Sequence, residues 1–433
     1  MSGITVGLIC MALMLFLMFS GMNMGFTFLI SGFVGVTMLL GIDGAFSFLG
    51  TLPVTTAMTY TFVVLPLFML MGDISVRGSL TTDAYRCARV WLGNQRGGLA
   101  ITSTVASAIF GAICGSASAT AMIMSQVSWP EMKRYGYDPK IGLSSIAAAG
   151  PLAILIPPST PIIIYGILAE VSVGQLFMAG WIPGIILTTA LCLTTLILTR
   201  IHPTWAPSAD KEPLKEKVKA LGQAWPILLL VVMVMVCIWG GFSTVNEAAG
   251  VAVVGAAVIC FAKRRISVKE FIKTLHDSAS TCAGMFFMFI GIQVFNSFLT
   301  LSGLPSVISA WVCGLQMSPY AVIWAIVVLY LILGCFIDTP VIMMLTIPLF
   351  APAVAALGFN LIWFGIVSTM CVALGSITPP VGLCLFVIAA RIKDVPLATI
   401  IRGIWPYILA TLIVTAAVIH IPVLATWLPS VMS

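Results

Sequence analysis

The chain has 433 residues, of which 60% are hydrophobic and only 8% are charged. A soluble domain averages roughly 45–50% apolar and about 25% charged residues, so this composition excludes an ordinary soluble fold. A transmembrane helix needs about 20 apolar residues, which leaves room for roughly ten spans in a chain of this length.

The first half of the chain, residues 1–222, contains four uninterrupted apolar stretches and two interrupted ones. The uninterrupted stretches, which we interpret as single spans, are 3–20, 24–41, 54–72 and 175–199. Stretch 98–130 is interrupted around Gly115, which predicts a hairpin. Stretch 141–168 is interrupted at Pro157 and Pro158, which predicts a broken helix, because proline cannot continue a regular helix.

The second half, residues 223–433, repeats this order. Its uninterrupted spans are predicted at 224–242, 247–262, 278–302 and 404–427. A hairpin is predicted at 318–357, interrupted between Gly334 and Asp338. A broken helix is predicted at 361–390, interrupted at Pro379 and Pro380. Each half therefore reads as three spans, a hairpin, a broken span and a closing span.

The positions of the basic residues predict how these elements cross the bilayer. All 20 Lys and Arg residues fall in five segments, which are 77–96, 133–140, 200–219, 263–273 and 391–402. If both hairpins return to the side from which they enter, all five segments lie on one side, as cytoplasmic loops do. The N-terminus is then periplasmic, and the basic residues, which give the chain its net charge of +6, face the inner leaflet of the lipid bilayer. This placement excludes a nucleic-acid-binding role.

Five crossings in each half place the second half upside down relative to the first. The predicted fold class is therefore an all-α membrane protein with about ten transmembrane helices and two re-entrant hairpins in an inverted repeat. Such repeats are common in secondary transporters.

The four interruptions are the candidate functional sites. Non-helical backbone at membrane depth is tolerated only where protein or a water-filled cavity satisfies it. Broken helices free carbonyl groups that suit Na⁺ and N–H groups that suit an anion. The alternative for Gly115, Ser116 and Ser118 is close packing of helices through small residues.

Asp338 is the only acid within the predicted apolar spans, where charged groups are rare and usually functional. Two interpretations remain open, an ion ligand or a helix cap, and one residue can serve as both. Asp43, Glu170 and Glu247 lie at predicted outer ends and are interpreted as solvated caps. Gln293 and Asn296 are expected to form hydrogen bonds between helices.

No enzyme motif occurs in the sequence, and neither a G-x-S-x-G nor an H-E-x-x-H nor a Walker A pattern is found. The eleven cysteines include no C-x-x-C pair and are interpreted as packing residues. We therefore expect no enzymatic activity, no cofactor, and no metal other than Na⁺ as the coupling ion.

At these motifs the sequence resembles the large membrane subunit of the tripartite ATP-independent periplasmic (TRAP) transporters. The stretches that carry the resemblance are Gly115–Ala121, Glu131–Asp138, Ile156–Ser159, Gly334–Pro340 and Thr378–Gly382. One departure lies in Ala149–Ala153, where the family pattern has Thr and Gly in place of Pro151 and Ala153.

The resemblance implies a sodium-driven importer of organic acids, such as carboxylates or sugar acids, in the bacterial inner membrane. It implies an elevator-type movement, as in the ion transporter superfamily. It also implies two partners, a small four-helix membrane subunit, expected here as a separate chain, and a periplasmic substrate-binding protein.

The resemblance also assigns residues to three sites. The first sodium site would use Ser116, Ser118, Gly150 and Pro157, and the second would use Gly334, Asp338, Thr378 and Pro379. The carboxylate substrate would lie near Ser159, Thr378, Pro158 and Pro380. The alternative functions are a stand-alone sodium–carboxylate symporter or an ion antiporter of related architecture. An intramembrane enzyme or a membrane scaffold is disfavoured by the repeat.

Overall fold

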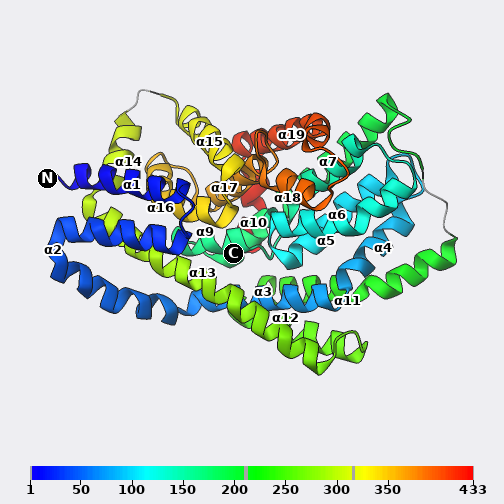
Figure 1. Cartoon of the computed structure of the whole chain (residues 1–433), viewed down its shortest axis with the longest axis horizontal. Helices are drawn as coiled ribbons and strands as arrows, with labels where there is room; N and C mark the ends of the chain where they lie inside the picture. The colour runs from blue at the N-terminus through cyan, green and yellow to red at the C-terminus, as the bar shows by residue number, and fades with distance from the viewer. Residues whose placement is uncertain (1, 209–212, 315–316, 433) are drawn as a thin grey trace.

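The computed structural model describes residues 2–208, 213–314 and 317–432, and every regular element in these ranges is a helix (Figure 1). The helices of the first half are α1 (Gly3–Phe19), α2 (Met24–Met58), α3 (Val64–Arg77), α4 (Leu80–Leu92), α5 (Gly98–Cys114), α6 (Ala117–Arg134), α7 (Pro139–Ala149), α8 (Leu152–Leu155), α9 (Thr160–Leu168) and α10 (Val173–Ile201). A short 3₁₀ helix, η1 (Tyr60–Val63), precedes α3.

The second half continues with ten more helices. They are α11 (Leu214–Trp239), α12 (Val245–Ala262), α13 (Val268–Ser302), α14 (Leu304–Gly314), α15 (Pro319–Phe336), α16 (Thr339–Ala356), α17 (Leu361–Gly375), α18 (Leu383–Arg391), α19 (Leu397–His420) and α20 (Val423–Met432). Lys211, which belongs to the third basic segment, lies outside the described residues.

The number of spans agrees with the sequence. Within the described ranges, nine helical segments are long and apolar enough to cross a membrane, or ten if the bent pair 139–155 and 160–168 counts as one. α15 and α16 are each among the nine, so their length allows a full crossing. The re-entrant path of hairpins 98–130 and 318–357, and the repeat boundary at residue 222, stay predictions.

The helices form two packed groups (Figure 1). In one group, α13 packs along α2, α12 packs against α3, and α11 packs against α4. In the other group, α5 to α10 pack with α15 to α20; α7 lies against α19, α16 against α9, and α6 against α18. The second group brings both hairpins and both broken helices together, although they are far apart in the sequence.

The second and third predicted spans have different limits in the structure. α2 runs from Met24 to Met58 but is interrupted at Gly41, whose φ of 80° only glycine adopts without strain. The chain reverses there, so the segment after Gly41 continues through η1 into α3. Asp43, predicted at an outer end, is exposed. It lies two residues after this reversal, close to the start of the second helical segment of α2.

The end of α3 corrects the prediction that Asp338 is the only acid in the apolar spans. The predicted span stopped at residue 72, but α3 continues to Arg77 and includes Asp73. The sequence predicts a loop at these polar residues, whereas in the structure an ion pair and a hydrogen bond to α13 satisfy them inside the helix. The last predicted span, 404–427, is also divided, because the chain leaves the helix at Ile421 and Pro422.

The four interruptions have the local structure that their residues predict. Hairpin 98–130 is α5 and α6 joined at Gly115, and hairpin 318–357 is α15 and α16 joined at Ile337 and Asp338. The two broken helices separate after α8 and after α17. Both Pro–Pro peptide bonds, at Pro157–Pro158 and Pro379–Pro380, are cis.

Candidate functional site

A small cavity lies where the two hairpin tips meet the first broken helix. Its volume is about 100 Å³, and its lining residues are Met69, Cys114, Gly115, Ser116, Ala117, Ile154, Thr160, Pro161, Met285, Asp338, Thr339 and Pro340. The lining combines the second helical group with Met69 of α3 and Met285 of α13 from the first. The cavity therefore lies at the boundary between the two groups.

Three helices begin at this cavity. Ala117 is the first residue of α6, Thr160 of α9 and Thr339 of α16, and each lines the cavity. The first four N–H groups of a helix have no partner within the helix, and its N-terminal end carries partial positive charge. Three such ends create a favourable place for an anionic group without any basic side chain.

The first tip is built around Gly115 and Ser116. Gly115 has a φ of 63°, and a methyl group in its place would lie 2.9 Å from Thr160 Oγ1. Ser116 caps α6, and its Oγ is 3.4 Å from Ser118 Oγ. Gly150 approaches the same tip so closely that a methyl group there would lie 2.9 Å from the Ala117 carbonyl oxygen. Ser116, Ser118 and Gly150 of the predicted first sodium site are therefore neighbours.

The second tip packs against the break after α17. A methyl group on Gly334 would lie 2.8 Å from the Cα of Gly375, so the two backbones are in direct contact. The Gly382 N–H donates a hydrogen bond to the Cys335 carbonyl at 3.2 Å, and the Cys335 thiol is 3.7 Å from the Pro379 carbonyl oxygen. Gly334 and Pro379 of the predicted second sodium site thus lie on facing segments.

Asp338 combines the two interpretations left open by the sequence. It is the N-cap of α16, and its Oδ1 accepts a hydrogen bond of 2.9 Å from the Thr339 N–H. It also lines the cavity, and it is exposed. Its cap role uses one carboxylate oxygen, which leaves the other for a ligand.

Several residues predicted near the substrate do not line this cavity. Ser159 is buried, and its hydroxyl donates a 2.6 Å hydrogen bond to the Ile154 carbonyl. The Thr378 hydroxyl donates to the Leu374 carbonyl at 2.6 Å. Pro157, which was predicted at the first sodium site, does not line the cavity either and packs against Gly180 of α10. The cavity is lined instead by the residues that follow Ser159, which are Thr160 and Pro161. Pro158 and Pro380 are also absent from its lining.

The sequence did not single out Met69, Asp73 or Met285. α3 supports the first tip directly, because a methyl group on Gly72 would lie 2.9 Å from the Ile113 carbonyl oxygen. Met69 lines the cavity one turn earlier in the helix, and Asp73 follows Gly72. The signal for this contact was a glycine followed by an acid at the end of an apolar run.

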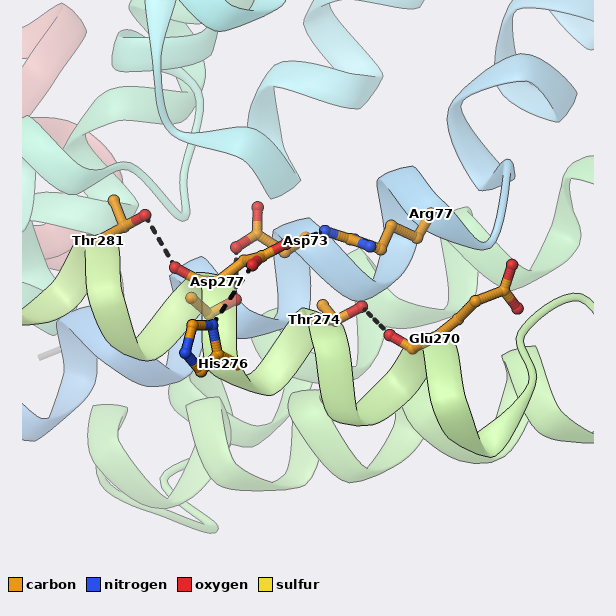
Figure 2. A network of polar contacts seen from close by, with 8 residues as sticks. Asp73, Arg77, Glu270, Thr274, His276, Asp277 and Thr281 are labelled. Atoms are coloured by element: carbon orange, nitrogen blue, oxygen red, sulfur yellow. Dashed lines mark hydrogen bonds and ion pairs between the residues drawn. The ribbon is translucent and has the colours of Figure 1, made fainter.

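Figure 2 shows the polar network that joins α3 to α13 next to this contact. Asp73 Oδ2 accepts a 2.5 Å hydrogen bond from the buried Ser278 hydroxyl. One turn later, Arg77 forms an ion pair with Asp277. His276 Nδ1 lies 3.6 Å from the same aspartate. These contacts hold together the two helices that supply Met69 and Met285 to the cavity.

A second, larger cavity lies between α2, α13, the end of α9 and α16. Its volume is about 600 Å³, and its polar lining residues include Thr55, Thr59, Gln293, Asn296 and Thr300. Gln293 and Asn296 were expected to form hydrogen bonds between helices. They line this cavity instead, and within the described residues the buried Asn296 Oδ1 has no hydrogen-bond partner. Glu170 also lines it, whereas Glu247 caps α12, as expected, in a capping box with Thr244.

This architecture defines a class of protein. Long apolar helices pack beside a group of hairpins and broken helices, and helix ends converge on a cavity between them. Discontinuous helices of this kind form the binding sites of secondary transporters.

Comparison with known families agrees with this class. The family model described as "Tripartite ATP-independent periplasmic transporter, DctM component" matches residues 11–424. The chain is 33% identical over 376 residues to the C4-dicarboxylate TRAP transporter large permease protein DctM of Pseudomonas aeruginosa, covering 87% of each chain. It is 29% identical to the sialic acid TRAP transporter large permease protein SiaM of Vibrio cholerae, covering 95% of this chain and 96% of the relative. It is also 29% identical to the ectoine/5-hydroxyectoine TRAP transporter large permease protein UehC of Ruegeria pomeroyi, covering 96% of each.

The chain belongs to the DctM component family of TRAP transporters. It is a multi-pass membrane transport protein and not an enzyme. A family of tripartite transporters implies, in general, a small membrane subunit and a periplasmic binding protein as partners. Among solved structures, the YdaH transporter of Alcanivorax borkumensis has a similar fold, with a TM-score of 0.67, 17% identity and 90% coverage of each chain.

Proposed function

We propose that this chain is the transport subunit of a sodium-driven, binding-protein-dependent importer of organic acids. The observation that carries the proposal is the convergence of three helix N-termini and Asp338 on one cavity. The helix ends favour a carboxylate, whereas Asp338 favours a cation. A site that attracts both charges is suited to cotransport of an anion with Na⁺.

Relatives support the substrate class. The names of three of them specify C4-dicarboxylates, sialic acid and ectoines, all of which carry a carboxylate group. None of the residues that line the small cavity is Lys, Arg or His. Affinity for the carboxylate then comes from the helix N-termini, from hydroxyl groups such as those of Ser116 and Thr339, and from the bound cation.

The two proposed sodium sites lie at the two hairpin tips, one at each. Around the first, Ser116, Ser118 and the backbone near Gly150 offer neutral oxygens. Around the second, Asp338 offers a carboxylate, and the facing segments at Gly334 and Pro379 offer backbone carbonyls. Oxygen ligands of this kind suit a hard cation.

The proposed movement is of the elevator type. The small cavity lies at the boundary between the two helical groups, and the 600 Å³ cavity separates parts of the same groups. These cavities interrupt the packing between the two groups, which is the observation that favours a sliding movement between them. In the proposed orientation the N-terminus is periplasmic, the basic segments face the cytoplasm, and the protein lies in the bacterial inner membrane.

The test is uptake in proteoliposomes that hold this chain and its small membrane partner. Radiolabelled C4-dicarboxylates, sialic acid and ectoine are offered, each with its loaded binding protein, and with either Na⁺ or K⁺ outside. We expect uptake that requires both Na⁺ and the binding protein. Liposomes without protein and liposomes with the small subunit alone are the controls.

Two outcomes would contradict the proposal. Uptake with Na⁺ but without any binding protein would favour a stand-alone symporter. Uptake that is equal in Na⁺ and K⁺ would remove Na⁺ as the coupling ion.

A further inference from the structure

Two grooves outside the transport site lie in related positions of the two halves. Each is found where the helix that precedes a hairpin meets the hairpin. The first lies between α4, α5 and α11 and has a volume of about 390 Å³. The second lies between α14, α15 and α16 and has a volume of about 350 Å³.

The walls of the two grooves are alike. Apolar side chains line both. The first groove is lined by residues that include Cys87, Trp91, Ile109 and Leu228, and the second by residues that include Trp311, Ile326, Leu329 and Phe350. Among the described residues, neither groove is lined by a charged side chain. Each one is open to the surface and can hold an apolar chain.

The mouths of the grooves differ in charge. At the first, Lys217 Nζ lies 5.5 Å from the ring centroid of Trp91, which lines the groove. Arg86, next to Cys87, is half-exposed and lies 3.9 Å from Glu216. The start of α11 carries Lys215, Lys217 and Lys219 against the single acid Glu216. At the second groove the sequence contains no Lys, Arg, Asp or Glu from residue 304 to residue 337.

We propose that the first groove binds an anionic phospholipid, with one acyl chain between α4, α5 and α11 and the phosphate at Arg86 and Lys217. The apolar walls match the chain, and the cations at the mouth match the headgroup. The second groove has similar apolar walls but no cation at its mouth, so it has no preference for an anionic lipid. Because α4 and α11 belong to the first helical group and α5 to the hairpin, the lipid lies across the boundary between the two groups.

In the orientation proposed above, the mouth of the first groove faces the cytoplasm, so the lipid belongs to the inner leaflet; this part of the inference rests on the proposed function. Lipid binding is measured without transport, so its failure and the failure of the transport proposal are seen separately. The probe is an equimolar mixture of phosphatidylglycerol and phosphatidylcholine with the same acyl chains. The complex of this chain with its small subunit is purified in that mixture, and the retained lipids are identified by native mass spectrometry.

The wild-type complex is expected to retain phosphatidylglycerol in preference to phosphatidylcholine. The double variant Arg86→Gln/Lys217→Gln should lose this preference by about fivefold for each cation removed. Arg86→Lys/Lys217→Arg, which conserves the charge, should keep it. High salt should weaken the preference, because the mouth is exposed.

A matched pair of substitutions tests the groove itself. Cys87→Phe places a large side chain in the first groove and should remove the retained phosphatidylglycerol. Ala325→Phe does the same in the second groove and should leave phosphatidylglycerol retention unchanged. A photoreactive residue at position 228, in the wall of the first groove, should crosslink to lipid.

Three results would overturn the proposal. One is equal retention of the two lipids by the wild-type complex. Another is an unchanged preference in Arg86→Gln/Lys217→Gln. The third is crosslinking from position 228 to the small subunit in place of lipid, which would assign the groove to the interface between the subunits.

Discussion

The two hairpin tips have similar backbone plans and different chemistry. In both, a helix ends, the chain turns, and a second helix with a capped N-terminus begins at the 100 Å³ cavity. The first tip offers only hydroxyl and backbone oxygens, from Ser116 and Ser118. The second offers a carboxylate, from Asp338. The turns differ as well, because the first needs a positive φ at Gly115, whereas the second turns through Ile337 and Asp338 without one.

This difference separates two properties of the site. Helix ends that converge on a cavity are a consequence of backbone geometry, and both tips supply them. The sign and strength of the local charge depend on single side chains, and only the second tip supplies a full charge. The second tip is therefore expected to contribute most of the affinity for the cation, and the first tip to contribute less.

The largest expected effect comes from Asp338→Asn, which removes the charge and keeps the shape and a cap acceptor. Loss of a charged ligand costs about 2 kcal/mol, so the apparent affinity for Na⁺ should fall by roughly 30-fold. The measurement is uptake in proteoliposomes as a function of Na⁺ concentration. An unchanged dependence on Na⁺, with normal protein in the membrane, would leave Asp338 with its cap role alone.

The second prediction concerns the shape of the tips. In Gly334→Ala the added methyl group meets the backbone of Gly375, which cannot rotate away, so we expect destabilisation by about 1–3 kcal/mol. Gly115→Ala should cost about 1 kcal/mol, because its positive φ disfavours a side chain. Thermal unfolding of the purified complex measures both.

Gly284→Ala is the matched control for these two substitutions. Gly284 lies in α13 with no atom within 4 Å of an added methyl group. It should keep the wild-type midpoint of thermal unfolding or raise it slightly. If Gly334→Ala unfolded at the wild-type temperature, the close contact between α15 and α17 would be wrong.

A smaller effect is expected at the first tip. Ser116→Ala removes one neutral oxygen, which is worth about 1 kcal/mol, or roughly a fivefold loss of apparent Na⁺ affinity. Ser125→Ala is the control, because Ser125 lies on the same helix and donates to the Met122 carbonyl, away from the tip. Equal effects of the two substitutions would favour helix packing as the role of Ser116.

The smallest effect is expected for Thr378→Val. The Thr378 hydroxyl already donates to the Leu374 carbonyl, so the side chain contributes little to a ligand set in which the backbone can serve. We expect less than about a twofold change in apparent Na⁺ affinity, by the same uptake measurement. A loss as large as that of Asp338→Asn would make the hydroxyl a direct ligand and would place it at the second tip.

Much of the architecture could be predicted from the sequence, because its signals are local. Apolar stretches of span length, together with double prolines and glycine-rich interruptions, predicted the helices, the hairpins and the broken segments. The predicted limits of a helix were wrong where the residues that stabilise its end lie far away in the chain. Asp73 and Arg77 looked like the start of a loop until Ser278 and Asp277 of α13 were found beside them.

The site was predicted in part for the same reason. Ser116 and Asp338 line the cavity because they are the caps of helices that begin there, which a local motif can indicate. Ser159 and Thr378 do not line it, because their hydroxyl groups turn back to carbonyls of α8 and α17, the helices that precede the two breaks. Thr160, Met69 and Met285 complete the lining, and no pattern in their own segments marks them.

By itself, the sequence determined that this chain is a membrane protein. It also determined the positions at which the helices break and the family that the chain resembles. These properties follow from hydrophobicity and from the conformational limits of proline and glycine, which act over a few residues. Only the tertiary structure decided which interruptions meet, which side of each break faces the cavity, and which scaffold residues close it. Those properties depend on packing between segments more than 200 residues apart, as for Asp73 and Ser278, and packing of that kind leaves no periodic trace in the chain.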